Sequence, residues 1–135
     1  MQDRPTAPEL LDAMAAQLYG EVREWVPRER RFQILVLANL CAVLGRELRA
    51  GDEPSRTDLA AFRALLGEAG GGAAELAGDD LAAQVRSAAA DLAARIRSGE
   101  LDERLPEAIE TLHEHTARKL EIARPGYAEE DSPQS

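Results

Sequence analysis

Carboxylate and imidazole side chains alternate in the segment ETLHEH, residues 110–115, which holds both histidines of the chain. Glu110 and His113 have the Glu-x-x-His spacing of carboxylate-bridged di-iron bundles. Such a centre needs a second Glu-x-x-His pair, and the chain has no further histidine. His113 and His115 point to nearly opposite sides of a helix, so one helix cannot direct both at one metal ion. We therefore expect a solvated helix face with Glu114 and Arg118 paired, and no metal site.

Residue types that act as nucleophiles or cradle phosphate groups also occur. Cys41 lies within the apolar run ILVLANLCAVL, residues 34–44, where a buried structural thiol is the preferred interpretation. No serine stands in a Gly-x-Ser-x-Gly elbow. The glycines at 70–72 lack the Lys-Ser/Thr pair and the preceding strand of a phosphate-binding loop. The sequence thus predicts no catalytic residues and no cofactor.

Asn39 places a polar amide in an apolar stripe of the second predicted helix. An amide that is buried without a partner costs about 1 to 3 kcal/mol, so buried amides are hydrogen-bonded. We expect a core asparagine bonded to another helix, which would fix the register of the two helices. The alternative is an amide that faces a partner or ligand.

Three arginines, Arg28, Arg30 and Arg31, open the same predicted helix, where positive charge opposes the helix macrodipole. We interpret them as a solvated helix end that Glu24 and Glu29 neutralise. The alternative is a site that accepts an anionic group from a partner or a ligand.

The segment ARIRSGELDERLPE, residues 94–107, combines a helix stop with a cluster of charges. Gly99 is suited to a left-handed helix cap, and Leu101 to the apolar contact beyond it. Glu100 or Asp102 is expected to hold Arg97. We favour a structural corner, and the alternative is partner contact through Arg97, Glu100 and Asp102.

Helical signals dominate the elements that must position these residues, and strand-forming residues are sparse. Thr6 and Glu9 predict a capping box that starts a helix over residues 7–26. A second helix over 28–50 is apolar nearly all round, which predicts a helix central in a bundle or half covered by another chain. A short helix ends at Gly67, a fourth follows from an Asp79 or Asp80 cap to residue 98, and a fifth runs from 105 to about 124. The predicted fold is all-α: one helical bundle of four main helices plus one short helix.

Length and charge limit the organisation and the partners. A chain of 135 residues fits a single domain, which we place at residues 1–127, with a flexible Gly/Ala-rich loop at 67–78 and an acidic disordered tail at 128–135. The net charge of −9 argues against nucleic acid and against an anionic membrane surface. No export signal and no stretch of about 20 apolar residues is present, so a cytoplasmic location is expected.

Taken together, segments spread over most of the chain resemble a bacterial family of small helical proteins of unknown function. These segments are Arg4 to Leu11, Ala38-Asn39, Arg46-Glu47-Leu48, Leu65-Leu66-Gly67, Ile96 to Asp102, Lys119-Leu120 and Pro125-Gly126-Tyr127. Their order and spacing carry the resemblance, which extends from Arg4 to about Tyr127.

Members of that family are commonly encoded beside an aminoglycoside-phosphotransferase-like kinase and an acyl-CoA dehydrogenase. The resemblance implies a non-catalytic accessory subunit of a kinase that phosphorylates a hydroxyacyl-CoA, with the dehydrogenase-like protein in the same pathway of acid catabolism. Two alternatives remain: a metal-dependent bundle enzyme built around Glu110 and His113, and a homodimer that uses the second helix as its interface.

Overall fold

The computed structural model describes residues 4–68 and 72–127 of the chain. Within these residues it contains helices and no strand, and five of the helices are 11 to 21 residues long. The predicted all-α fold of four main helices and one shorter helix is confirmed. Part of the predicted loop, residues 69–71, and the whole predicted tail, residues 128–135, lie outside the described residues.

Contacts between residues divide the chain into two units, and each is described by itself. Of the described residues, the first unit comprises 4–51 with 122–124, and the second comprises 52–68, 72–121 and 125–127. The single domain expected over residues 1–127 stays a prediction.

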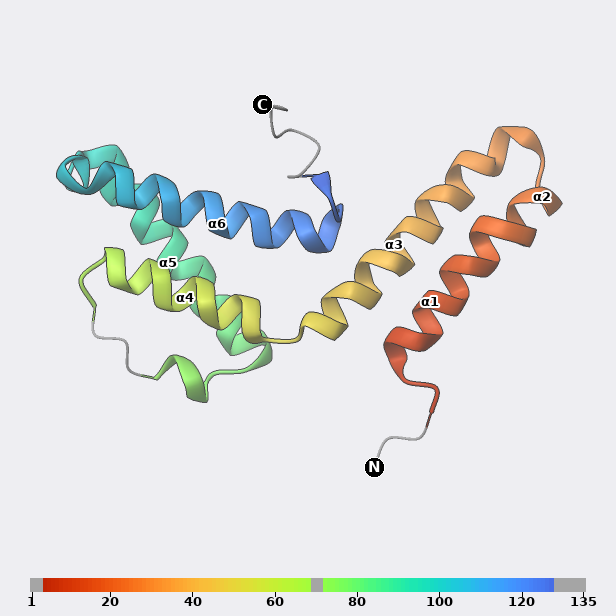
Figure 1. The fold of residues 1–135 in the computed structure, drawn as a ribbon, viewed down its shortest axis with the longest axis horizontal. Coiled ribbons are helices and arrows are strands. Elements are labelled where there is room, and N and C mark those ends of the chain that lie inside the picture. Colours follow the sequence, from red (N-terminus) through yellow and green to blue (C-terminus); the bar gives the residue numbers. More distant parts are fainter. Residues whose placement is uncertain (1–3, 69–71, 128–135) are drawn as a thin grey trace. The chain divides into compact units, whose positions relative to one another are not determined.

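The first unit is a helical hairpin (Figure 1). Its first arm is α1, Ala7–Gln17, which continues as a π-helix over Leu18–Val22 and ends in α2, Arg23–Trp25. After Pro27, a 3-10 turn over Arg28–Arg30 leads into α3, Arg31–Ala50, which runs back beside α1. The two helices predicted from the sequence are therefore present with nearly the predicted bounds.

Thr6 caps the start of α1 as predicted. Its hydroxyl accepts a hydrogen bond from the Glu9 N–H at 3.4 Å, and the Glu9 carboxylate accepts one from the Thr6 N–H at 2.7 Å. The backbone and side-chain hydrogen bonds of Thr6 lower the pKa of Glu9 below its ordinary value. Pro8 occupies the first turn, where a missing N–H costs nothing.

Small residues form the contact between α1 and α3. The buried residues of α3 are Ala38 and Gly45, and α1 has none. A Cβ atom on Gly45 would lie 3.3 Å from Asp12 Oδ1 and 3.7 Å from Leu11 Cβ, so glycine permits the close approach of the helices. Because α3 packs against α1 along one side, the rest of its apolar surface stays open. Within the hairpin, the prediction that α3 is central in a bundle is therefore wrong, and the alternative, half coverage by another chain, stays a prediction.

The second unit packs three longer helices around a core of large side chains. They are α4, Glu53–Leu65, α5, Gly78–Ser98, and α6, Leu105–Ala123, of which residues 105–121 belong to this unit. Short 3-10 turns lie at Ala73–Glu75 and Asp102–Arg104. The core consists of Leu59, Phe62, Leu65, Leu66, Leu81, Ala88, Leu92, Leu101 and Ala108.

Glycines end two helices of this unit in the left-handed conformation that the sequence predicts. Gly67 has φ 73° and Gly99 has φ 82°, and the N–H of each following residue bonds back to a carbonyl five residues earlier. The predicted cap at Asp79 or Asp80 is wrong. Both acids lie in the first turn of α5, and the N–H of Gly78 instead donates to Asp52 Oδ2 at 3.2 Å.

Candidate functional site

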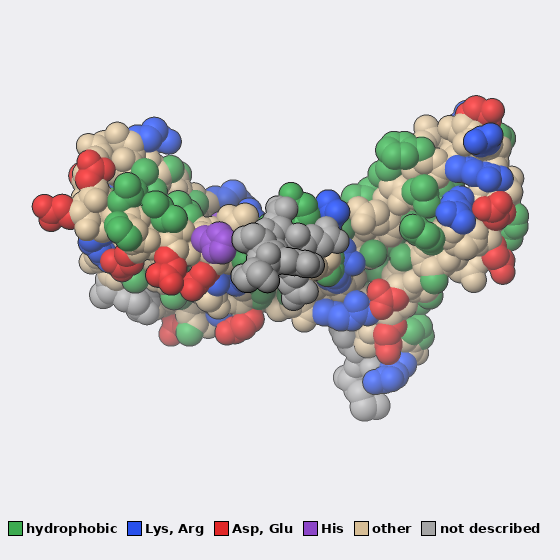
Figure 2. Space-filling model, turned by 45° about the horizontal axis from the view of Figure 1, so that its top comes forward, with side chains coloured by type: hydrophobic (Ala, Val, Ile, Leu, Met, Phe, Trp, Pro, Cys, Tyr) green, Lys and Arg blue, Asp and Glu red, His purple; other side chains and the backbone are tan. Residues whose placement is uncertain are grey.

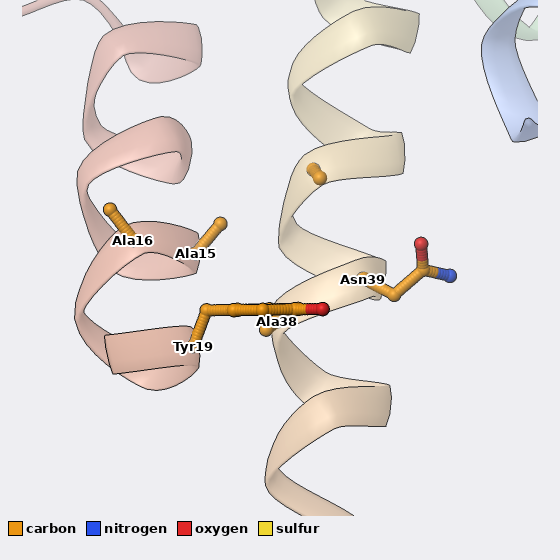
Figure 3. A pocket seen from close by; sticks show the side chains of 6 residues that line it. Ala15, Ala16, Tyr19, Ala38 and Asn39 are labelled. Carbon is orange, nitrogen blue, oxygen red and sulfur yellow. The ribbon is translucent and has the colours of Figure 1, made fainter. Parts of the chain in front are cut away.

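Asn39 lies exposed on α3, so the prediction of a buried core amide is wrong. The residues facing α1 are its small neighbours, and no hydrogen bond of the Asn39 amide occurs among the described residues. Figure 3 shows Tyr19 reaching from the first arm toward α3, while the Asn39 amide points away from Tyr19. A pocket of about 310 Å³ lies at this point of the hairpin, lined by Ala15, Ala16, Tyr19, Ala38, Asn39 and Ala42. Whether the Asn39 amide contacts a partner stays a prediction.

The hairpin leaves an unusual amount of apolar side chain exposed. Phe32 is 74 % exposed and Trp25 is 72 % exposed, at the end where the two arms join. Five of the exposed residues recur at every fourth position of α3, so they follow one another along the helix as a continuous ridge. We call the full set the hairpin apolar surface: Leu10, Met14, Tyr19, Trp25, Phe32, Val36, Leu37, Leu40, Leu44 and Leu48. Figure 2 shows hydrophobic side chains gathered on the face of the hairpin that is in view.

The arginines near the turn of the hairpin are only partly neutralised. Arg31 pairs with Glu24 at 3.4 Å, and Arg23 pairs with the same carboxylate at 3.4 Å while its guanidinium lies over the Tyr19 ring. Arg28 and Arg30 are exposed and form no ion pair with any residue that the structure describes. The predicted neutralisation is thus confirmed for Glu24 with Arg31, whereas Glu29 forms no ion pair with any described residue and does not neutralise Arg28 or Arg30.

Arg97, Glu100 and Asp102 do not form the cluster expected at the helix corner. Arg97 is exposed and has no hydrogen bond or ion pair within the described ranges, so the prediction that Glu100 or Asp102 holds it is wrong. Glu100 instead lies 3.9 Å from Arg95 Nε and accepts a hydrogen bond from the Ser98 hydroxyl at 3.2 Å.

Other contacts explain the corner as local structure. The Asp102 N–H bonds to the Gly99 carbonyl at 3.2 Å, and Leu101 is buried in the core, as predicted. Arg95 Nη1 donates to the Leu66 carbonyl at 2.9 Å, which joins the end of α5 to the end of α4. Partner contact through Arg97, Glu100 and Asp102 stays a prediction.

The two histidines of α6 lie in different surroundings. His113 and Glu110 are exposed, and no group of three or more metal-binding side chains occurs among residues 4–68 and 72–127. The side chain of His115 is only 18 % exposed, so the expectation of a solvated face is wrong for this residue. Glu114 and Arg118 do lie 3.9 Å apart, as predicted.

Asp58 on α4 is the reason that His115 and Arg118 turn inward. It is a buried charged residue at 6 % exposure, and its Oδ2 lies 2.7 Å from His115 Nδ1. Its other oxygen, Oδ1, accepts from Arg118 Nε at 2.9 Å and from Nη2 at 2.5 Å. The Phe62 ring meets the His115 ring edge to face at a centroid distance of 5.2 Å. A buried carboxylate is thereby satisfied on both oxygens, as burial of a charge requires.

Our interpretation of the sequence missed Asp58, although a signal was present. Asp58, Phe62 and Leu65 are spaced four and three residues apart, so an acid stands in the stripe of α4 that enters the core. His115 follows Ala108 and Leu112 at the same spacing on α6. An acid and an imidazole that both stand in apolar stripes are candidates for a buried pair.

Comparisons with known proteins place the chain in a family but give it no described relative. None of the curated proteins and none of the solved structures matches it. Within the described residues, no helix combines the length and the hydropathy needed to cross a membrane. A family model matches residues 24–127, which cover all of α3 to α6 and begin within α2. The chain therefore belongs to the family described as a domain of unknown function, DUF6285.

Proposed function

We propose that this protein is a non-catalytic accessory subunit that binds a phosphotransferase-family kinase through the hairpin apolar surface. The observation that carries the proposal is the contrast within the hairpin between exposed and buried side chains. Its buried residues within the described part are Ala38 and Gly45, whereas ten large apolar side chains are 41 to 74 % exposed. Exposed apolar patches of this kind mark surfaces that bind other proteins.

The identity of the partner comes from the resemblance described above. In that family the neighbouring kinase is expected to act on a hydroxyacyl-CoA, and an acyl-CoA dehydrogenase-like protein to act in the same pathway of acid catabolism. The hypothesis that the chain itself performs no catalysis belongs to the same proposal. A homodimer through the same surface is the competing occupant, because a ridge of apolar residues on α3 also suits a second copy.

Co-expression of the full chain with that kinase, followed by size-exclusion chromatography, tests the proposal. We expect the two proteins to co-elute, and the kinase to lose activity when the chain is omitted. The variant Phe32→Glu should abolish co-elution because it places a charge on the apolar surface. The matched control is Ile109→Glu, which charges an apolar side chain of α6 that is 58 % exposed but lies in the second unit.

Three results would contradict the proposal. The first is kinase activity that is indifferent to the chain, and the second is co-elution that survives Phe32→Glu. The third is a chain that elutes alone as a dimer and becomes monomeric with Phe32→Glu, since the surface would then be occupied by a second copy. Melting temperatures of both variants, measured in parallel, separate lost binding from lost folding.

A further inference from the structure

A small cavity lies inside the second unit, next to the buried Asp58 group. Its volume is about 130 Å³, and side chains from α4, α5 and α6 line it: Phe62, Ala89, Leu92, Ala93, Ile96, Leu112 and His115. An apolar cavity of about 150 Å³ is large enough to take up benzene. Leu112 is 37 % exposed, so the lining of the cavity extends to the surface of the unit.

His115 supplies the polar group of this lining. Asp58 accepts two hydrogen bonds from Arg118 and is therefore a carboxylate, which can only accept. In the form of the ring that carries a single N–H, that hydrogen lies on Nδ1, which faces Asp58 Oδ2 at 2.7 Å. No hydrogen bond to Nε2 occurs among the described residues. Nε2 is thus the nitrogen left to accept a hydrogen bond from a ligand.

The lining also limits the charge of a ligand. No charged side chain lines the cavity, and an ion without a partner is costly to remove from water. A neutral molecule that donates one hydrogen bond satisfies Nε2 without that cost. Its remaining atoms must be apolar and few, because the other six lining side chains are hydrocarbon and the volume is small.

We propose that this cavity is a binding site for a small neutral molecule with one hydroxyl group on an apolar body. The hydroxyl donates to His115 Nε2, and the apolar body packs against Phe62, Leu92 and Ile96. Asp58 and Arg118 act as positioning residues, because they fix the orientation of the imidazole ring and the nitrogen that carries its proton. The inference does not depend on the kinase partner.

Titration of the full chain with phenol, followed by NMR, tests this site. Phenol should cause saturable shifts of the His115 ring signals and of the Phe62 ring signals. Benzene, which has nearly the same shape and no hydroxyl, should bind about threefold to tenfold more weakly, as expected for the loss of one hydrogen bond. Absence of saturable shifts at His115, or equal binding of phenol and benzene, would overturn the proposal.

Two alanines of α5 provide a matched pair of variants. Ala93→Leu fills the cavity and should remove phenol binding, whereas Ala94→Leu, on the exposed side of the same helix, should leave it unchanged. Binding that persists in Ala93→Leu, or that is lost equally in both variants, contradicts the site. If Ala93→Leu does not fold, His115→Leu, which has no hydrogen-bond acceptor, gives the second measurement, and its ratio of phenol to benzene affinity should fall to about one.

Discussion

The two units of the chain differ in the side chains that their helices bury. In the second unit, Phe62, Leu59, Leu81 and Leu92 are less than 2 % exposed. In the first unit, the contact between α1 and α3 uses alanine and glycine, and Phe32 is 74 % exposed. Burial of a large apolar side chain stabilises a fold by about 1.5 to 3 kcal/mol, and burial of an alanine by much less. The second unit thus has a core of its own, whereas ten large apolar side chains of the hairpin are 41 to 74 % exposed.

The largest expected difference in stability between the units is the difference between Phe62→Ala and Phe32→Ala, which replace the two phenylalanines of the chain. Phe62→Ala should lower the free energy of unfolding by about 3 to 5 kcal/mol, because it removes a ring from a closed core. Phe32→Ala should change it by less than about 0.5 kcal/mol, because that ring is already in water. Urea unfolding followed by circular dichroism measures both. Equal losses for the two variants would contradict the contrast between the units.

A second comparison uses one aspartate from each unit. Asp58→Asn leaves Arg118 without its buried carboxylate partner and should cost about 2 to 4 kcal/mol of stability. Asp12 pairs with Arg49 in the hairpin, but both side chains are about half exposed, and Asp12→Asn should cost less than about 1 kcal/mol. Raising the salt concentration should weaken the stabilisation by the Asp12–Arg49 pair more than that by the Asp58–Arg118 pair, because salt screens buried pairs less. An Asp58→Asn loss no larger than that of Asp12→Asn would show that the buried group contributes little.

The features that the sequence predicts well are those that depend on neighbouring residues. Thr6, Gly67 and Gly99 were predicted correctly because each acts within four or five residues of itself. A capping hydroxyl or a left-handed glycine is determined by its immediate neighbours, so its role is visible in the local pattern.

Burial was harder to predict because it depends on distant segments. Asn39 and His115 both stand in apolar stripes, yet one is exposed and the other is mostly buried. The difference comes from the contacts: α3 meets α1 through its own small residues Ala38 and Gly45, while His115 meets Asp58, which is 57 positions away in the chain. No local pattern contains that pairing.

Substitutions at Gly99 and Arg97, where α5 ends, should have smaller effects on the free energy of unfolding. Gly99→Ala should lower the free energy of unfolding by about 1 to 2 kcal/mol, because alanine resists φ 82° and its Cβ would lie 3.1 Å from Asp102 Oδ2. Arg97→Ala should change stability by less than about 0.5 kcal/mol, because Arg97 is exposed and forms no ion pair in the described chain. If Arg97→Ala also loses kinase binding at an unchanged melting temperature, partner contact is supported. A lower melting temperature would show instead that Arg97 stabilises the corner.

The smallest expected effect is a change in how strongly acid destabilises each unit. Hydrogen bonds from Thr6 lower the pKa of Glu9, and the hydrogen bond from Arg104 lowers that of Glu107, each below the ordinary 4.5. A carboxyl whose pKa is lower in the folded state stabilises the fold above its unfolded pKa, and this contribution is lost as the pH falls through the folded value. Glu9→Gln and Glu107→Gln should therefore each reduce the difference in stability between pH 7 and pH 3.

The two variants separate the units when unfolding is followed residue by residue. Hydrogen exchange of backbone amides at both pH values should show that Glu9→Gln affects protection in α1, and Glu107→Gln protection in α6. The effect on α1 should be the more local, because the described part of the hairpin has no cluster of buried large side chains that couples its first turn to the rest. Equal and global changes for both variants would mean that the chain unfolds as one cooperative unit. The two units would then have the same stability against unfolding, although only the second buries large apolar side chains.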